Sequence, residues 1–171
     1  MKLYGTRGGS GTALLARAVY LAYGLAPLPP VERTETGKPF FPQHPKLFFN
    51  LSHSGPLVLC ALSARPVGVD IEVIKPRRAA LPRQALTEDE YRRYLALGED
   101  WPAFYTLWTR KEAWCKYSGL GLAEQWGKTP PDHEHYRSYA GDGWRAAVWG
   151  EEAPPEHITW LKGEDTLEAV P

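Results

Sequence analysis

Two stretches of this chain carry ionisable side chains in patterns that suit phosphate chemistry. In the stretch 67–73, VGVDIEV, Asp70 and Glu72 are two residues apart, so they point to the same face of a strand. Further along, Glu112 and Lys116 are four residues apart, so they share one face of a helix. Three carboxylates brought together repel unless a cation lies between them. An all-oxygen ligand set suits Mg²⁺, which commonly shares substrate phosphates. The pattern therefore favours a magnesium-dependent reaction on a phosphorylated substrate.

The helical stretch places charged groups where a core-facing side is expected. Phe104 and Trp108 precede Glu112 at intervals of four residues, so these residues and Lys116 fall on one stripe. A carboxylate on an apolar stripe is costly unless something pairs with it. An isolated Asp-x-Glu pair is more often the solvated face of an edge strand. Glu112, the acid on the apolar stripe, favours the interpretation that Asp70 and Glu72 bind a metal ion.

A phosphate also needs cationic or N–H donors. Lys38 lies between a glycine and a proline, which fix its backbone. Ser52, His53 and Ser54 lie at the end of a predicted strand, where a loop could present hydroxyl, imidazole and N–H groups together, and Arg7 lies in a glycine-rich loop. Each of these residues alone is more often a surface charge or a turn residue, so they count only as a group.

Other motifs give weaker signals. The histidines of 133–135 would share one strand face, but further zinc ligands at suitable spacing are missing from the sequence. The segment GLGL at 119–122 follows no strand, so it is not a phosphate loop, and no Walker, Rossmann or nucleophile-elbow pattern occurs.

Composition indicates an ordinary globular protein. Twenty basic and 20 acidic residues cancel, so no overall charge indicates nucleic acid or an anionic membrane as a partner. Cys60 and Cys115 form no paired motif, and both are interpreted as small buried hydrophobes. The first residues lack the apolar core of a signal peptide, and no apolar run approaches the roughly 20 residues that span a bilayer. We therefore expect a cytoplasmic protein.

Periodicity and turn residues predict an α+β fold. Helices are expected over 12–23, 87–97 and 102–117. Strands are expected over 2–5, 47–52, 57–63, 67–73, 134–140, 144–149 and 157–161. A hairpin turn is predicted at 53–56, Gly119 and Gly121 should end the last helix, 124–132 should form a loop and 164–171 a loose tail. Each half could be a helix packed on a small antiparallel sheet.

Four pieces of the sequence together resemble the phosphopantetheinyl transferases of the surfactin-synthetase-activating (Sfp-like) type. They occur in the family's order: GKPFFP at 37–42, FNLSHS at 49–54, VGVDIE at 67–72 and LWTRKEAWCKYSGLGL at 107–122. Any one piece alone would be weak, whereas the ordered set is highly specific. The resemblance covers most of positions 1–122.

The resemblance implies both an activity and an architecture. Such enzymes use Mg²⁺ and transfer the phosphopantetheine arm of coenzyme A to a serine of an apo acyl or peptidyl carrier protein, releasing adenosine 3',5'-bisphosphate. These carriers serve fatty acid, polyketide or nonribosomal peptide synthesis. The fold is a pseudo-dimer of two α+β halves with coenzyme A between them. Residues 1–66 would be the N-terminal half, which contacts coenzyme A. Residues 67–171 would carry the magnesium site and the carrier-protein surface.

The resemblance also implies roles for single residues. The implied magnesium ligands are Asp70, Glu72 and Glu112, the implied coenzyme A contacts are Lys38, Ser52 and His53, and the implied lysine near the pyrophosphate is Lys116. The segment between Tyr4 and Thr12 is much shorter than in the usual member. Lysines that hold the nucleotide there have no counterpart, and Arg7 is proposed as a substitute.

The mechanism expected from these roles leaves two alternatives open. Glu112 and Lys116 are the predicted catalytic residues, with Glu112 as the candidate base for the serine proton. One alternative is a non-catalytic module that binds coenzyme A or a carrier protein, and intact acids and Lys116 argue against it. Another is a different magnesium-dependent phosphotransferase, which the GKP and SHS pieces disfavour. A monomer is expected, because one chain would contain both halves.

Overall fold

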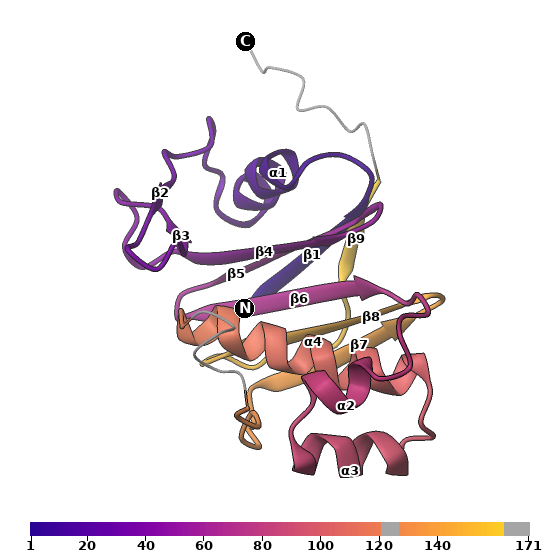
Figure 1. Ribbon diagram of the computed structural model, residues 1–171. Helices are drawn as coiled ribbons and strands as arrows, with labels where there is room; N and C mark the ends of the chain where they lie inside the picture. The colour runs from indigo at the N-terminus through magenta and orange to yellow at the C-terminus, as the bar shows by residue number, and fades with distance from the viewer. Residues whose placement is uncertain (121–126, 163–171) are drawn as a thin grey trace.

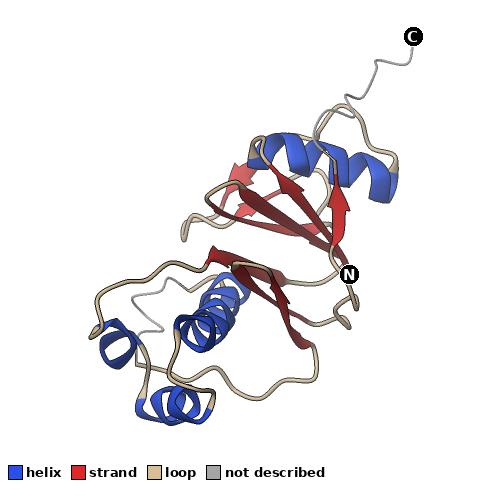
Figure 2. Cartoon of the chain, turned by 90° about the vertical axis from the view of Figure 1, so that its right-hand side faces the viewer, coloured by secondary structure: helices blue, strands red, loops and turns tan. Residues whose placement is uncertain are grey.

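The computed structural model describes residues 1–120 and 127–162, and it confirms an α+β fold. The two larger of its three sheets lie against each other, with one helix on the outside of the first and three helices on the side of the second (Figures 1 and 2). The strands are β1 (Lys2–Arg7), β2 (Glu32–Arg33), β3 (Pro39–Phe40), β4 (Phe48–Ser54), β5 (Leu57–Ser63), β6 (Val67–Val73), β7 (Tyr136–Gly141), β8 (Trp144–Gly150) and β9 (Thr159–Leu161). The helices are α1 (Gly11–Tyr23), α2 (Leu81–Ala85), α3 (Glu88–Ala96) and α4 (Trp101–Ser118).

The first sheet has the strand order β4-β5-β1-β9. Strand β1 pairs with β5 in antiparallel fashion, and β9, which comes from the far end of the chain, joins β1 in parallel. Helix α1 packs on one face, where Leu14, Leu15 and Val19 meet buried residues of the sheet such as Cys60 and Leu62. The predicted helical stripe of this segment therefore faces a sheet.

The second sheet is antiparallel, with the order β6-β8-β7. Helix α4 begins at the Asp100 cap, ends at Gly119 with φ 71°, and lies across β6 and β8. The approach is close because Gly68 has no side chain: a Cβ there would lie 2.2 Å from the carbonyl oxygen of Ala113 and from the nitrogen of Tyr117. A glycine in β6 thus fixes how near α4 comes to this strand.

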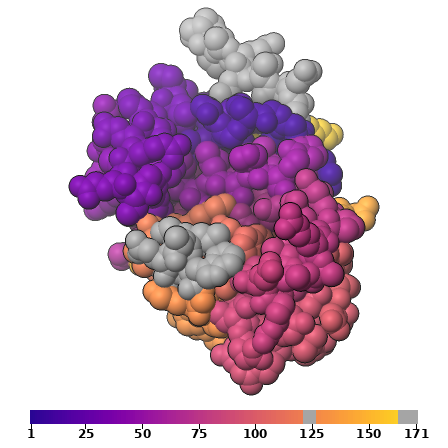
Figure 3. Space-filling model, in the orientation of Figure 1, coloured from indigo at the N-terminus to yellow at the C-terminus, as the bar shows by residue number. Residues whose placement is uncertain are grey.

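The two sheets share one apolar core. Apolar side chains from both sheets fill it: Leu3, Leu57, Leu59 and Ala61 from the first, and Val67, Val69, Ile71, Ala146 and Val148 from the second. In the space-filling view, the N-terminal part, indigo to purple, sits directly on the magenta-to-orange C-terminal part (Figure 3). Strand β6, the first strand of the predicted C-terminal half, lies at this junction.

Most predicted elements form within one or two residues of their predicted ends, with three differences. Strand β4 continues through Ser54, so the predicted turn at 53–56 shrinks to Gly55 and Pro56. The short helix α2 and the two-residue strands β2 and β3 were not predicted, because such short elements carry no periodicity. Some predictions concern residues outside the described ranges. These are the helix end at Gly121, the first part of the loop at 124–132 and the tail at 164–171. No described helix is long and apolar enough to cross a membrane.

Candidate functional site

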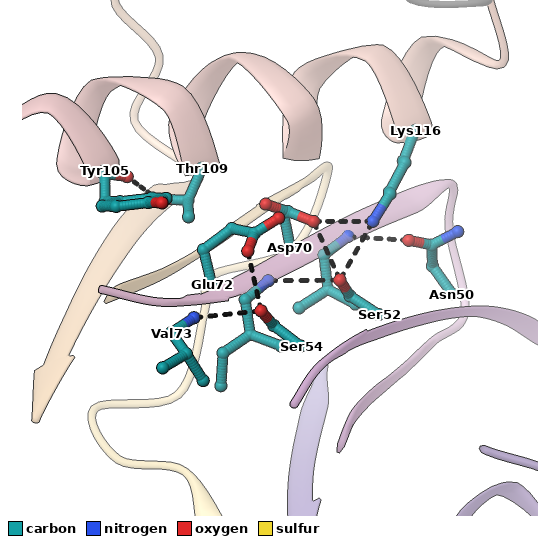
Figure 4. Close-up of polar contacts among 11 residues, drawn as sticks. Asn50, Ser52, Ser54, Asp70, Glu72, Val73, Tyr105, Thr109 and Lys116 are labelled. Carbon is teal, nitrogen blue, oxygen red and sulfur yellow. Dashed lines mark hydrogen bonds and ion pairs between the residues drawn. The ribbon is translucent and has the colours of Figure 1, made fainter. Parts of the chain in front are cut away.

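The face of β6 that carries Asp70 and Glu72 lies against α4 and beside β4 (Figure 4). Asp70 is only 4% exposed, and Glu72 is half-buried. The two acids share one face, as the alternation of the strand predicts. The alternative of a solvated strand face is wrong for Asp70, because a buried carboxylate needs specific partners.

Two serines of β4 are partners of these two acids. The hydroxyl of Ser52 donates to Asp70 Oδ1 at 2.8 Å, and the hydroxyl of Ser54 donates to Glu72 Oε2 at 2.7 Å. Because both serines point to the same side of β4, one strand serves both carboxylates (Figure 4).

Asp70 is held from two sides but keeps one oxygen without a partner. Its Oδ1 also accepts from Lys116 Nζ at 2.7 Å, whereas Oδ2 is buried and has no hydrogen-bond partner among residues 1–120 and 127–162. Burial raises the pKa of Asp70, and the charge and hydrogen bond of Lys116 oppose that rise. An unpaired buried carboxylate oxygen is expensive, so Oδ2 is suited to receive a cation.

Glu112 of α4 joins this pair electrostatically. It is half-buried, and burial raises its pKa to about 7, with the negative charges of Asp70 and Glu72 adding to the rise and Lys116 opposing it. Both acids of β6 are therefore close enough to Glu112 to raise its pKa. Like charges in one site favour either a shared proton or a bound cation.

The donor set fits Mg²⁺ by its chemistry. It consists of carboxylate oxygens, and Asp70 Oδ2 lacks a partner; hard cations such as Mg²⁺ prefer such ligands. Among residues 1–120 and 127–162, no three His, Cys, Asp or Glu side chains already stand close enough together to hold a metal ion. The observations that favour a cation here are thus the unpartnered oxygen and the mutual repulsion of the acids.

Two lysines lie near the C-terminal end of α4. Lys116 bridges Asp70 and Ser52, with its Nζ 3.1 Å from the serine oxygen. Lys38, from the loop before β3, reaches the carbonyl oxygen of Tyr117 at 2.9 Å, and burial lowers its pKa to about 8. The predicted phosphate-binding lysine of the N-terminal part is therefore brought to the same helix as Lys116.

The hydroxyl of Ser52 is fully used within the protein. It donates to Asp70 and accepts from Lys116 and from the backbone N–H of Ile71 at 3.2 Å. A serine hydroxyl has one donor and two acceptor positions. In this arrangement Ser52 helps to hold the side chains of Asp70 and Lys116 in place.

The other two predicted contacts lie elsewhere around β4. His53 is exposed and points to the opposite side of β4 from Ser52 and Ser54, because neighbouring strand residues alternate. Arg7 is exposed at the end of β1, pairs in register with Leu57, and places its guanidinium over the ring of Trp160. The structure therefore does not bring Arg7 or His53 into the hydrogen-bonded group of Asp70, Ser52 and Lys116.

The helical stripe contains a buried charge that sequence reasoning missed. Phe104 is buried and stacks with Trp108, as expected. The completely buried charge, however, is Lys111, whose ammonium lies 2.6 Å from Glu90 and 3.2 Å from the carbonyl oxygen of Ala85. A signal was present, since Lys111 follows Phe104 by seven residues and therefore shares its stripe.

A cavity of about 270 Å³ opens beside Glu72. It is lined by Glu72, Arg77, Leu81, Phe104, Tyr105 and Trp108. A second cavity of about 300 Å³ lies between α3, α4 and β7, and none of Asp70, Glu72 and Glu112 lines it. Space for part of a ligand is thus present next to Glu72.

Comparison with known proteins identifies the family. The model of the 4'-phosphopantetheinyl transferase superfamily matches residues 66–160, which is more than half of the chain and includes β6 and α4. A 4'-phosphopantetheinyl transferase of Bacillus subtilis is 37% identical over 116 residues, which cover 66% of this chain and 52% of the relative.

Two further relatives carry the same activity in their names. The 4'-phosphopantetheinyl transferase Sfp of Bacillus subtilis strain 168 is 41% identical over 91 residues, 52% of this chain and 41% of the relative. The 4'-phosphopantetheinyl transferase AcpT of Salmonella typhimurium is 41% identical over 110 residues, 61% and 57% of the two chains. The chain spans about half the length of the curated relatives it matches. With the family model covering more than half of its residues, the chain belongs to the 4'-phosphopantetheinyl transferase superfamily.

Proposed function

We propose that this protein transfers the 4'-phosphopantetheine group of coenzyme A to a serine of an apo acyl or peptidyl carrier protein. The reaction would depend on Mg²⁺ and release adenosine 3',5'-bisphosphate. The observation that carries the proposal is the coupled group of Asp70, Glu72 and Glu112, with Lys116 held against Asp70. Family membership supports the same reaction.

The halves of the molecule are proposed to form a pseudo-dimer. Residues 1–66 would be the half that contacts coenzyme A, and residues 67–171 the half with the magnesium site and the carrier-protein surface. In support, α1 packs on the first sheet much as α4 packs on the second. Strand β9 is an addition from the end of the chain to the first sheet.

Asp70, Glu72 and Glu112 are the proposed magnesium ligands, with Asp70 contributing its unpartnered Oδ2. When bound, Mg²⁺ supplies positive charge that neutralises pyrophosphate oxygens as the anhydride breaks. Lys116 adds a fixed positive charge beside the same oxygens and holds Asp70 in place.

Coenzyme A is proposed to bind through residues of the N-terminal half. Lys38 supplies a cation near the end of α4, and His53 and Arg7 supply exposed donors at the ends of β4 and β1. Ser52 supports the site from within, because its hydroxyl is committed to Asp70, Lys116 and the β6 backbone. Cationic and imidazole donors of this kind suit phosphate oxygens.

The chemical step follows from these positions. The serine oxygen of the carrier attacks the phosphorus that bears pantetheine, and a new P–O bond forms. The anhydride P–O bond breaks, and its electron pair leaves on adenosine 3',5'-bisphosphate. The serine proton passes to Glu112, directly or through a water. Glu112 is the candidate base because it is the carboxylate that α4 brings close to Asp70 and Glu72, and an ionised carboxylate can accept a proton.

The protein is proposed to act as a cytoplasmic monomer, without nucleic acid or membrane as partners. Support comes from the single chain that supplies both sheets around the acids and from the balance of 20 basic and 20 acidic residues. The partners proposed are coenzyme A and the apo carrier protein.

The test is to incubate the protein with coenzyme A, Mg²⁺ and an apo carrier protein, and then to measure the mass of the carrier. We expect the carrier to gain one phosphopantetheine group. Binding of coenzyme A without a mass change would instead indicate a non-catalytic binding module. No binding of coenzyme A would reject the proposal and leave a different magnesium-dependent phosphotransferase.

A further inference from the structure

Strands β4 and β6 are joined by side chains rather than by a backbone ladder. The two strands belong to different sheets, yet they are neighbours. Alternate side-chain oxygens of β4 accept the backbone N–H groups of alternate β6 residues: Asn50 from Val69 at 2.9 Å, Ser52 from Ile71 at 3.2 Å, and Ser54 from Val73 at 3.1 Å. Each pair is 19 residues apart. The two strands therefore run parallel in a fixed register.

The register has a consequence for the acids. The β6 residues whose N–H groups are held flank Asp70 and Glu72 in the chain, so the contacts fix the backbone on both sides of each acid. Short polar side chains take the place of carbonyl oxygens, so the strands stand further apart than paired strands do. Hydroxyl groups, which can also donate, then occupy the space between the strands.

Ser54 combines both functions for Glu72. Its hydroxyl accepts from the N–H of Val73 and donates to Glu72 Oε2 at 2.7 Å, so one atom fixes the backbone and the carboxylate together (Figure 4). Ser54 is 8% exposed. Asn50 makes the same kind of backbone contact, because its side-chain oxygen accepts the N–H of Val69. Asn50 is therefore a matched comparison for Ser54.

We infer that Ser54 is a positioning residue that sets the orientation of Glu72 and ties it to the register between the two sheets. The inference rests on the proposed function only where it concerns the metal. Hydrogen bonds that orient a ligating carboxylate typically change metal affinity about 10- to 100-fold when they are removed. Loss of Ser54 should therefore weaken metal binding without removing any ligand.

A double-mutant cycle in urea, with EDTA present, tests the contact without any ligand. We expect Ser54→Ala to lower the urea midpoint of unfolding. It should lower the midpoint less in a Glu72→Ala background, because the Ser54–Glu72 hydrogen bond is already absent there. Asn50→Ala should lower the midpoint by the same amount in both backgrounds. An equal effect of Ser54→Ala in both backgrounds would overturn the inference.

Mn²⁺ binding, followed by electron paramagnetic resonance with coenzyme A present, tests the consequence. Ser54→Ala should weaken Mn²⁺ binding about tenfold or more, and Ser54→Thr should restore it. Asn50→Ala should weaken Mn²⁺ binding clearly less than Ser54→Ala does, because Asn50 holds only the backbone N–H of Val69 and no carboxylate oxygen. Unchanged affinity in Ser54→Ala would also overturn the positioning role.

If alanine prevents folding, Ser54→Cys offers a side chain of similar size with only a weak donor. Failure of the wild-type protein to bind Mn²⁺ or coenzyme A would reject the proposed function, while the urea cycle would still decide the Ser54–Glu72 contact.

Discussion

The protonation of Glu112 is set by burial and by its acidic neighbours. Removal from water is the largest cause of its raised pKa, and Asp70 and Glu72 add to it. Lys116 opposes the rise but is engaged with Asp70 Oδ1. In the absence of a cation the site therefore keeps Glu112 partly protonated near neutral pH, and a cation would replace that proton.

Removing the charge of Glu112 should change how stability depends on pH. Because folding raises the pKa of Glu112 from 4.5 to about 7, its contribution is complete below about pH 4.5 and is lost as pH rises through 7. Relative to Glu112→Gln, the wild type should lose about 1 to 2 kcal/mol of unfolding free energy between pH 5 and 8, after allowance for solvent screening. Urea unfolding of both proteins in EDTA measures this. A difference that stays flat or reverses sign would contradict the environment described for Glu112.

At the scale of elements, the site depends on how closely α4 lies against β6. Gly68 lets the backbone of α4 come within contact of β6. The same helix places Lys116 against Asp70 and brings Glu112 close enough for Asp70 and Glu72 to raise its pKa. On its other side, α4 is fixed to α3 by the buried pair of Lys111 and Glu90. Both contacts set where the face of the helix that carries Glu112 and Lys116 lies.

Adding one methyl group to β6 should displace the helix. In Gly68→Ala the new Cβ would meet backbone atoms of Ala113 and Tyr117 at 2.2 Å, and backbone has little freedom to move aside. We expect a loss of about 3 kcal/mol in the free energy of unfolding, measured by urea denaturation. Gly11→Ala is the control, since its Cβ would meet only Leu51 Cδ1 at 3.5 Å. Equal stability of the Gly68 variant and the wild type would refute this packing.

Breaking the buried ion pair should be costly. Lys111→Met leaves Glu90, which is 3% exposed, as an uncompensated buried charge, and such losses amount to about 3 to 5 kcal/mol. The double variant Lys111→Met, Glu90→Gln should recover part of the loss. Arg83→Met, which breaks the exposed Arg83–Glu88 pair, should change stability far less than Lys111→Met does. Thermal and urea unfolding compare the four proteins, and a single Lys111 variant as stable as the control would contradict the account.

The sequence predicted the elements with strong periodicity and the acids they carry. The alternation of β6 placed Asp70 and Glu72 on one face, and helical spacing brought Glu112 and Lys116 together, because both patterns depend only on local geometry. The burial of Lys111 and the saturation of the Ser52 hydroxyl depend on partners from distant parts of the chain. Local spacing carries no information about those partners.

On the scale of the whole molecule, the chain brings its two larger sheets together at the acids. Strand β4 of the first sheet supplies Ser52 and Ser54, and β6 of the second supplies Asp70 and Glu72. Lys38 crosses from the N-terminal part to the carbonyl oxygen of Tyr117. The site therefore needs both parts of the molecule in register, and the β4–β6 side-chain ladder is the connection that sets it.

The most direct measurement is the mass of an apo carrier protein after incubation with coenzyme A and Mg²⁺, using the wild type and Glu112→Gln in parallel. We predict one added phosphopantetheine group with the wild type, and a rate reduced by at least about 100-fold with Glu112→Gln. Glu112→Ala should show the same loss. Glu112→Gln should remain folded, because removing a buried charge costs no stability above pH 7. Near-normal transfer by a folded Glu112→Gln variant, or no transfer by the wild type, would contradict the central claim.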